Sequence, residues 1–374
     1  MDEVEGHQKP LSLRFESKNF WADFKRELKV DKTGTAIIID ICSIPDWVSY
    51  SRTSRHYDVP HRYRNSLYTF RKVVGQVDYL AAEGLIEHDR RAPGARGWQS
   101  AMKATNELRT ICTALLAGQQ PLLRRPSEVI LLRNAAGHLA DYKDTRELGR
   151  MRRRTEAFNE AITGGDIDIS ITAPMARIYN QSFGRGGRFY AQGSSWQNMK
   201  AEARKQIEIA GEPVAELDFS TLHPSILYAE VGAIPPADCY AIKGWDRKLV
   251  KVAMLTLINA PTIHSARHSI AHNERMEHPG SQDALHTADM LIEDIKQLHL
   301  PIAASFHSDA GARLMNIDAS IAEMVMTTMI GQGIVVLPVH DSFLVAQSKA
   351  AQLEAAMMQA AILHGLNRIA VNQK

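Results

Sequence analysis

The sequence predicts an α+β fold, and three observations lead to that prediction. Apolar residues recur at three- and four-residue spacing between Tyr63 and Gly84, which is typical of an amphipathic helix. Two later runs are apolar like strands, and each carries one aspartate, Asp218 and Asp341. Helical spacing returns between these two runs. Strands and helices therefore share one chain of 374 residues, which is long enough for two domains.

Composition places the protein in the ordinary range of soluble globular chains. Hydrophobic residues make up 45% of the sequence and charged residues 23%. Apolar stretches such as Gly331 to Val345 contain His and Asp and are shorter than the roughly 20 residues of a membrane span. The segment Met1 to Pro10 has no apolar centre typical of a secretory signal, so we expect the chain in the cytoplasm and not in a membrane. The three cysteines lie far apart in the sequence and suggest neither a zinc site nor a disulfide framework.

Charge is distributed unevenly along the chain. Between Tyr50 and Thr155 there are 20 lysines and arginines against 10 aspartates and glutamates, whereas the whole chain has 44 against 42. A basic segment beside an acidic remainder fits a contact with nucleic-acid phosphates next to a metal-binding part. A solvated charged surface explains the same counts equally well.

The N-terminal third predicts a strand at Thr35 to Ile41 and then a helix that ends at Gly84. A short strand at residues 85–87, a basic turn at 90–97 and a returning strand at 98–104 follow. This order resembles the end of a winged helix, in which the wing would bring three arginines to phosphates: Arg90, Arg91 and Arg96. An ordinary helix and hairpin with solvated arginines is the alternative.

A hairpin and a basic helix are expected next. Residues 129–132 and 138–142 flank a turn at 134–137. A helix with several cations on one side then continues until Gly164 and Gly165. Arg150 and Arg153 on this helix are candidates to clamp a nucleic-acid backbone, as a polymerase thumb does, and a solvated helix face is the alternative.

Asp218 and Asp341 are the candidate metal ligands. Asp218 ends a strand-like run and is followed by Phe-Ser-Thr-Leu-His-Pro-Ser-Ile, which turns into an apolar helix. Asp341 follows His340 between two apolar strands, as at the tip of a hairpin. A carboxylate in such a setting needs a partner, which is either a metal ion or a buried salt bridge.

Arg247 and Lys251 lie between the two aspartates and are one helical turn apart, so they share one helix face and can hold a triphosphate. Two acids for magnesium and a cationic helix for phosphates are the minimum machinery of phosphoryl transfer by a two-metal mechanism. The combination is more specific than either aspartate alone.

The same residues resemble the motifs of nucleic-acid polymerases. The segment from Asp218 to Ile226 is similar to motif A of DNA polymerases, spelled most like family B, and the segment from Val339 to Phe343 is similar to motif C of family A enzymes and of single-subunit phage-type RNA polymerases. Arg247-x3-Lys251 with the residues up to Ala260 resembles motif B of the latter. Upstream, Gly187-Arg188-Phe-Tyr and Trp196-Gln197-Asn198 together resemble the region that contacts template and primer. This region and the three motifs A, B and C occur in the family order.

The resemblance implies a right-hand polymerase core with an antiparallel palm sheet and helical fingers, preceded by the winged-helix-like basic module. The expected domains are 1–125 for the N-terminal module, 126–170 for a thumb-like or connecting part, and 171–374 for palm and fingers. Asp218 and Asp341 would hold two Mg²⁺ ions, for which Mn²⁺ can substitute, and Lys251 and Arg247 would join them in catalysis. The implied nucleotide contacts are Phe219, His223, Arg247, Lys251 and Asn259, and the implied nucleic-acid contacts of the core are Arg188, Gln197, Asn198 and His340.

The implied activity is that of a compact DNA-dependent DNA polymerase without proofreading. Its partners would be a DNA template and primer and deoxynucleotide substrates, with accessory proteins of replication as further candidates. Asn259-Ala260 replaces the usual Tyr-Gly of motif B, and His223 stands where DNA polymerases place a residue that excludes a ribose 2′-hydroxyl. Two alternatives stay open: a single-subunit RNA polymerase or primase, and a winged-helix DNA-binding regulator whose polymerase-like part is inactive.

Overall fold

A computed structural model of the chain describes residues 9–13, 15–92, 99–119, 121–168, 171–193 and 195–374. The chain divides into two compact units. The first unit comprises Met1–Ile178, Phe189–Val214 and Val335–Val339, and the second comprises Tyr179–Arg188, Ala215–Ile334 and His340–Lys374. No helix in the described ranges combines the length and the apolarity that a membrane span requires.

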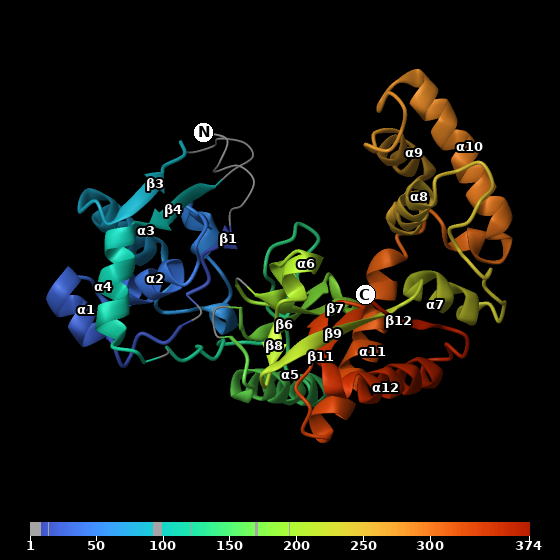
Figure 1. The fold of residues 1–374 in the computed structure, drawn as a ribbon. Helices are drawn as coiled ribbons and strands as arrows, with labels where there is room; N and C mark the ends of the chain where they lie inside the picture. Colours follow the sequence, from blue (N-terminus) through green and yellow to red (C-terminus); the bar gives the residue numbers. More distant parts are fainter. Residues whose placement is uncertain (1–8, 14, 93–98, 120, 169–170, 194) are drawn as a thin grey trace. The chain divides into compact units, whose positions relative to one another are not determined.

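The N-terminal part of the first unit is a small mixed sheet covered by helices (Figure 1). The sheet has the strand order β1-β2-β4-β3, in which β2, β4 and β3 pair antiparallel. Its elements are α1 (Trp21–Leu28), α2 (Lys32–Cys42), α3 (Phe70–Ala82), α4 (Asn106–Leu116), β1 (Lys9–Pro10), β2 (Val48–Tyr50), β3 (Ile86–Asp89) and β4 (Ser100–Ala104). The helix, strand and returning strand expected from the sequence are α3, β3 and β4.

The strand expected at Thr35 to Ile41 is wrong, because this segment is helix α2. Asp31 caps the helix, and its Oδ1 accepts hydrogen bonds from the backbone amides of Thr33 and Gly34 at 2.8 and 2.9 Å. Every residue from Thr33 to Ile41 is buried. A helix that is buried on all sides shows no polar face, so its sequence pattern is the same as that of a buried strand.

Further along the first unit, β5 (Ile130–Arg133) forms a three-stranded sheet with β6 (Met175–Asn180) and β7 (Ser182–Ala191), in the order β5-β6-β7. Residues 179–188 of this sheet belong to the second unit. Helix α5 (Arg146–Gly164) ends at the glycine pair, as expected, and packs near β5. The expected hairpin of residues 129–142 is reduced to one isolated bridge between Arg133 and Leu139. The short elements α6 (Ala201–Arg204), β8 (Glu208–Ile209) and β10 (Leu337–Val339) complete the unit.

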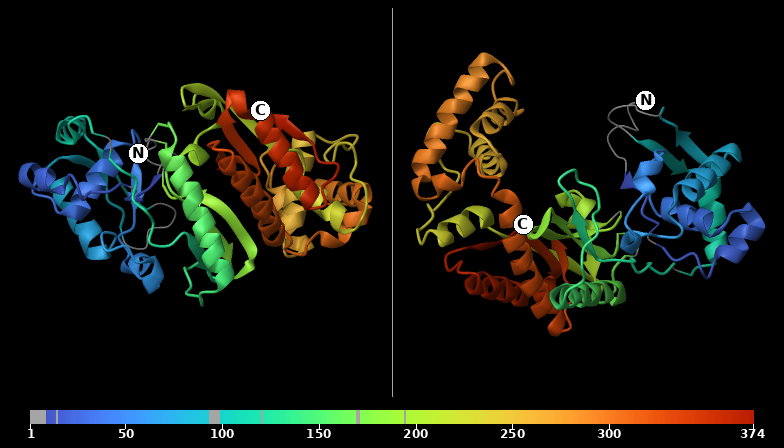
Figure 2. Two further views of the ribbon diagram at one scale, coloured as in Figure 1. Left: turned by 90° about the horizontal axis from the view of Figure 1, so that it is seen from below. Right: turned by 180° about the vertical axis from the view of Figure 1, so that it is seen from behind.

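The second unit contains most of a sheet of order β10-β11-β9-β12, in which β9 (Glu212–Phe219) lies between β11 (Ser342–Ala346) and β12 (Val371–Gln373). Strand β12 runs antiparallel to β9, and Asn372 is opposite Asp218. Helix α12 (Ala350–Leu363) packs on β11 and β12, and α11 (Gly311–Gly331) packs against α12 and α7 (Leu222–Glu230). Figure 2 shows α11 and α12 side by side.

The remaining helices of the second unit form a group of their own: α8 (Arg247–Asn259), α9 (Ile263–Ala271) and α10 (Gln282–Leu298). All three pack against one another, and they stand together in Figure 1. Asp246 caps α8 by accepting a hydrogen bond from the Leu249 amide at 2.9 Å. This cap fixes where the helix with Arg247 and Lys251 begins.

Candidate active site

Strand β9 carries Asp218 to the point where the chain turns into α7. The turn is sharp, because Thr221, the residue before α7, has a φ of 55°. The Asp218 side chain is 28% exposed, and Lys374 places its Nζ 3.2 Å from Oδ2. The other oxygen, Oδ1, is buried and has no hydrogen-bond partner among the described residues. A buried carboxylate oxygen without a partner is costly, so this position favours a cation.

Asp341 lies next to Asp218. It occupies a two-residue turn between β10 and β11, and its carbonyl oxygen accepts a hydrogen bond from the Phe219 amide at 3.3 Å. Burial raises the pKa of Asp218 to about 6, and the negative charge of Asp341 adds to the increase, while Lys374 and Lys251 oppose it. The two aspartates predicted as a pair from the sequence are therefore brought together.

His340 precedes Asp341 in a strained backbone conformation. Its φ of 61° lies in the left-handed region, which a bulky residue rarely adopts. Burial lowers the pKa of the His340 imidazole, and the nearby Arg188 guanidinium lowers it further. The ring is therefore neutral at pH 7.

Lys374 and Glu216 were not found by reasoning from the sequence. Lys374 follows strand β12, and pairing of β12 with β9 brings its Nζ within 3.3 Å of Glu216 Oε1 as well as close to Asp218. Ser342 donates a hydrogen bond to the same Glu216 oxygen at 3.1 Å. Nothing in the local sequence around Lys374 signals this role, because it depends on a strand pairing across the chain.

The residues at this position suit a hard divalent cation that retains water ligands. Mg²⁺ is usually bound through one or two carboxylates together with substrate phosphates and waters. Asp218 and Asp341 supply two carboxylates, and Asp218 Oδ1 has no hydrogen-bond partner among the described residues. Within the described ranges there is no cluster of three or more His, Cys, Asp or Glu side chains arranged to hold a metal.

Helix α8 carries Arg247 and Lys251, the two cations expected to bind phosphates, and of these Arg247 already has an acidic partner. Arg247 makes an ion pair with Asp238, with nitrogen–oxygen distances of 2.7 and 3.1 Å. Lys251 is exposed, and its charge lowers the pKa of Asp218. Both cations lie over the Tyr240 ring, at 5.3 Å for Arg247 and 5.8 Å for Lys251. Tyr240 is a further residue that the sequence did not indicate.

The remaining nucleotide contacts implied by the resemblance differ in accessibility. Phe219 is 3% exposed, so its side chain belongs to the core. Asn259 is exposed at the end of α8 and donates a hydrogen bond to the Leu255 carbonyl at 2.7 Å. The start of α11 lies directly against it, since a Cβ placed on Gly311 would be 1.7 Å from Asn259 Oδ1.

His223 and Arg188 share one buried partner, Asp318 on α11. Arg188 Nε lies 3.0 and 2.9 Å from the two Asp318 oxygens, and its Nη2 also contacts Oδ2. His223 Nε2 lies 2.9 Å from the same Oδ2. The three side chains are 16%, 11% and 2% exposed in the order Arg188, His223, Asp318. Asp318 had no recognisable motif in the sequence.

Gln197 and Asn198 belong to the first unit, where the Gln197 amide serves local structure. Its Nε2 donates hydrogen bonds to the carbonyls of Phe189 and Pro338 at 3.1 and 2.9 Å, and its Oε1 accepts one from the Ala191 amide at 2.9 Å. Asn198 is exposed and remains accessible to a ligand.

The basic residues expected to hold nucleic acid are mostly accessible. Arg90, Arg150 and Arg153 are exposed. Arg91 makes an ion pair with Asp89 at 2.9 Å, and Arg96 lies outside the described residues. On α5, Arg152 differs from its neighbours because it is held by Glu128 and Asp144, each at 2.9 Å.

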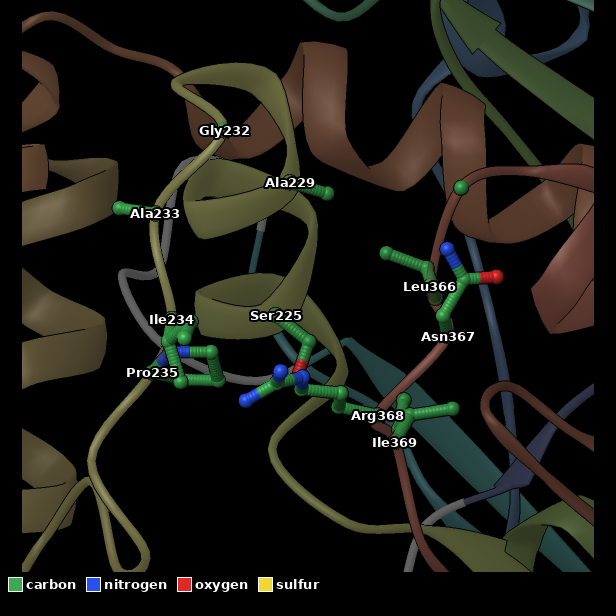
Figure 3. A pocket seen from close by; sticks show the side chains of 11 residues that line it. Ser225, Ala229, Gly232, Ala233, Ile234, Pro235, Leu366, Asn367, Arg368 and Ile369 are labelled. Atoms are coloured by element: carbon green, nitrogen blue, oxygen red, sulfur yellow. The ribbon is translucent and has the colours of Figure 1, made fainter.

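A separate cavity of about 320 Å³ lies between the end of α7 and the loop that precedes β12 (Figure 3). Figure 3 shows the Arg368 side chain extending toward Ser225 and Pro235. The cavity lining includes neither Asp218 nor Asp341, so this space is distinct from the carboxylate pair.

Comparisons with solved structures give distant similarities. No protein-family model matches the chain, and no curated protein matches it. A solved structure described as the "POL domain of Pol1 from M. smegmatis complex with DNA primer-template and dNTP" is similar to this chain with a TM-score of 0.37 and 11% identity. The similarity covers 71% of this chain and 59% of that one.

Proposed function

We propose that the protein is a template-directed nucleotidyltransferase, a compact DNA-dependent DNA polymerase, and that Asp218 and Asp341 hold its two catalytic Mg²⁺ ions. The observation that carries this proposal is the pair of adjacent aspartates, in which Asp218 has a pKa raised to about 6 and one buried oxygen without a partner among the described residues. Perturbed carboxylates of this kind are typical of functional sites.

Bound Mg²⁺ supplies activation of an attacking 3′-hydroxyl and neutralisation of charge on the phosphates. Lys251, exposed on α8 with a charge that lowers the pKa of Asp218, binds the nucleotide phosphates. Arg247 assists Lys251 once it exchanges Asp238 for phosphate oxygens, and Tyr240 orients both cations. Asn259 at the end of the same helix contacts the base or sugar.

His340 and Arg188 position the primer strand in this proposal. The neutral His340 ring offers hydrogen bonds without adding charge beside Asp341. His223 lies five residues after Asp218 at the start of α7, and its bulk opposes a ribose 2′-hydroxyl, so deoxynucleotides are preferred. Gln197 and Asn198 contact the template or primer strand.

The basic N-terminal third contributes binding to the nucleic-acid backbone. We assign residues 1–125 to a winged-helix-like module, 126–170 to a thumb-like connection and 171–374 to palm and fingers. The succession of α3, β3 and β4 and the strand order β2-β4-β3 support the winged-helix assignment. Exposed Arg90, Arg150 and Arg153 would contact phosphates without regard to sequence.

A primer-extension assay tests the proposed activity. The full chain is given Mg²⁺ and a template, with or without a primer, and either deoxynucleotides or ribonucleotides. We expect extension of a primer with deoxynucleotides. Ribonucleotide synthesis without a primer would identify an RNA polymerase or primase instead, and DNA binding without any incorporation in Mg²⁺ or Mn²⁺ would indicate an inactive regulator.

A further inference from the structure

Asp318 is a buried carboxylate on α11 that does not belong to the aspartate pair. Its side chain is 2% exposed, so its charge has almost no access to water. A buried charge of this kind is stable only when it is paired and its oxygens accept hydrogen bonds. Arg188 and His223 supply those donors, and they come from two other elements, β7 and α7.

The geometry fixes the direction of the His223 hydrogen bond. A carboxylate only accepts, so Nε2 of His223, 2.9 Å from Asp318 Oδ2, carries a proton and donates it. Arg188 Nη2 lies 3.3 Å from the same nitrogen, and an arginine nitrogen is always a donor. Two donors do not bond to each other, so His223 and Arg188 are held together only through Asp318.

We propose that Asp318 is a positioning residue that couples sugar selection by His223 to primer binding by Arg188. This inference rests on the proposed function, because it assigns both residues to the substrates of a polymerase. Asp318 fixes the His223 ring on one side and the Arg188 guanidinium on the other. Loss of the carboxylate releases both side chains together, whereas loss of His223 leaves Arg188 paired.

The chain offers a matched control on the same two helices. Arg313 on α11 makes an ion pair with Glu230 on α7, and both side chains are partly exposed, at 45% and 37%. Arg313→Gln therefore removes a contact between α11 and α7 without touching the buried network. Differences between Asp318 and Arg313 variants then report on the network and not on general loosening of the helix pair.

The test compares Asp318→Asn, His223→Ala, the double variant and Arg313→Gln in primer extension. Asparagine has nearly the volume of aspartate but only one side-chain oxygen. That oxygen alone would have to accept the hydrogen bonds that Arg188 and His223 donate to the two oxygens of Asp318. We expect Asp318→Asn to increase ribonucleotide relative to deoxynucleotide incorporation by about tenfold and to raise the apparent KM for primer–template. In the double variant the ratio should rise less than twofold above that of Asp318→Asn, and Arg313→Gln should match the wild type. An unchanged ratio and KM in folded Asp318→Asn would overturn the proposal.

A second measurement works even if no polymerase activity is found. Ring ¹⁵N resonances of His223, assigned with His223→Gln, report the protonation and hydrogen bonding of Nε2. They should shift in Asp318→Ala and stay constant in Arg313→Gln. Unshifted resonances would contradict the positioning of His223 by Asp318. A wild-type chain that incorporates no nucleotide but shows the shift would contradict the proposed function, and with it the coupling of sugar selection to primer binding, while Asp318 would still position the His223 ring.

Discussion

Asp218 has one carboxylate oxygen buried without a hydrogen-bond partner among the described residues, and Asp341 places a second negative charge beside it. Such an arrangement destabilises the folded chain whenever no cation is bound. The same features make it a good ligand position, because a divalent ion removes the repulsion and occupies the open oxygen. The features of Asp218 that favour binding of a cation therefore lower the free energy of unfolding of the metal-free chain.

Asp218→Asn should stabilise the metal-free protein in a pH-dependent way. The pKa of Asp218 is raised from 3.8 to about 6 in the folded chain, so ionisation favours unfolding. The variant and the wild type should be about equally stable below pH 4, and the stability of the variant relative to the wild type should increase between pH 4 and pH 6 to about 3 kcal/mol and stay constant at higher pH. Urea unfolding in EDTA at pH 4 and pH 8 measures this difference. A gain that is the same at both pH values would show that ionisation of Asp218 is not its cause.

Lys251→Ala should weaken nucleotide use specifically. In the proposed reaction its charge is needed most as negative charge shifts toward pyrophosphate, so the apparent KM for the nucleotide should rise and turnover should fall by about tenfold or more. Lys248→Ala is the matched control, because Lys248 is an exposed lysine on the same helix. Steady-state primer extension at varied nucleotide concentration measures KM and turnover for both variants. Equal effects of Lys251→Ala and Lys248→Ala would contradict a specific role of Lys251 in nucleotide binding.

The sequence indicated the residues whose local pattern carries chemistry, and it missed those defined by tertiary contacts. Asp218 and Asp341 could be paired in advance because each interrupts an apolar run. Asp318 sits in a helix with many apolar neighbours and Lys374 follows a three-residue strand, so neither stands out locally. Their positions follow from packing between segments far apart in the chain.

At the scale of elements, α5 shows that neighbouring arginines on one helix have different roles. Arg150 and Arg153 are exposed, whereas Arg152 is 25% exposed and donates two parallel hydrogen bonds to Glu128, whose side chain is 6% exposed. The run of basic residues in the sequence suggested one cationic face. Only the fold separates the residues that hold the helix in place from those available to a ligand.

Neutralising Arg150 and Arg153 together should weaken DNA binding without loss of stability. The slope of the logarithm of affinity against the logarithm of salt concentration should fall by about two, or one for each lost phosphate contact. Arg152→Gln should leave the slope unchanged and lower the free energy of unfolding by about 1–3 kcal/mol, since the buried Glu128 side chain loses the hydrogen bonds from Arg152 and keeps those from the Val129 and Ile130 amides and the charge of Arg62. Fluorescence anisotropy across a salt series measures the slopes. A slope change in Arg152→Gln equal to that of the double variant would contradict this division.

Helix α2 shows that the hydrophobic pattern of a sequence does not distinguish a fully buried helix from a strand. Its isoleucine run has the composition of a strand, yet Asp31 caps it as a helix and its nine residues from Thr33 to Ile41 are buried. Long amphipathic elements such as α3 and α5 were predictable because one face is polar. An element in the centre of a core has no such face, and tertiary packing decides its conformation.

At the scale of the whole molecule, the basic segment and the aspartate pair belong to different units. The basic segment from Tyr50 to Thr155 lies in the first unit, and the carboxylate pair with its helix α8 lies in the second. Binding and chemistry should therefore separate experimentally. Variants of the aspartates should still bind primer–template DNA, and variants of the exposed arginines should still carry out extension at low salt and high DNA concentration.

Mg²⁺-dependent primer extension by the wild type, Asp218→Ala and Asp341→Ala tests the central claim most directly, with folding and DNA binding measured on the same samples. Each substitution removes a proposed metal ligand and no core packing, so extension should fall by several orders of magnitude, roughly the loss of a principal catalytic group, while the fold and DNA affinity persist. A folded variant that keeps more than about a tenth of wild-type extension, an effect under ~1.4 kcal/mol, would contradict the assignment of these two aspartates as the ligands of the catalytic metal ions.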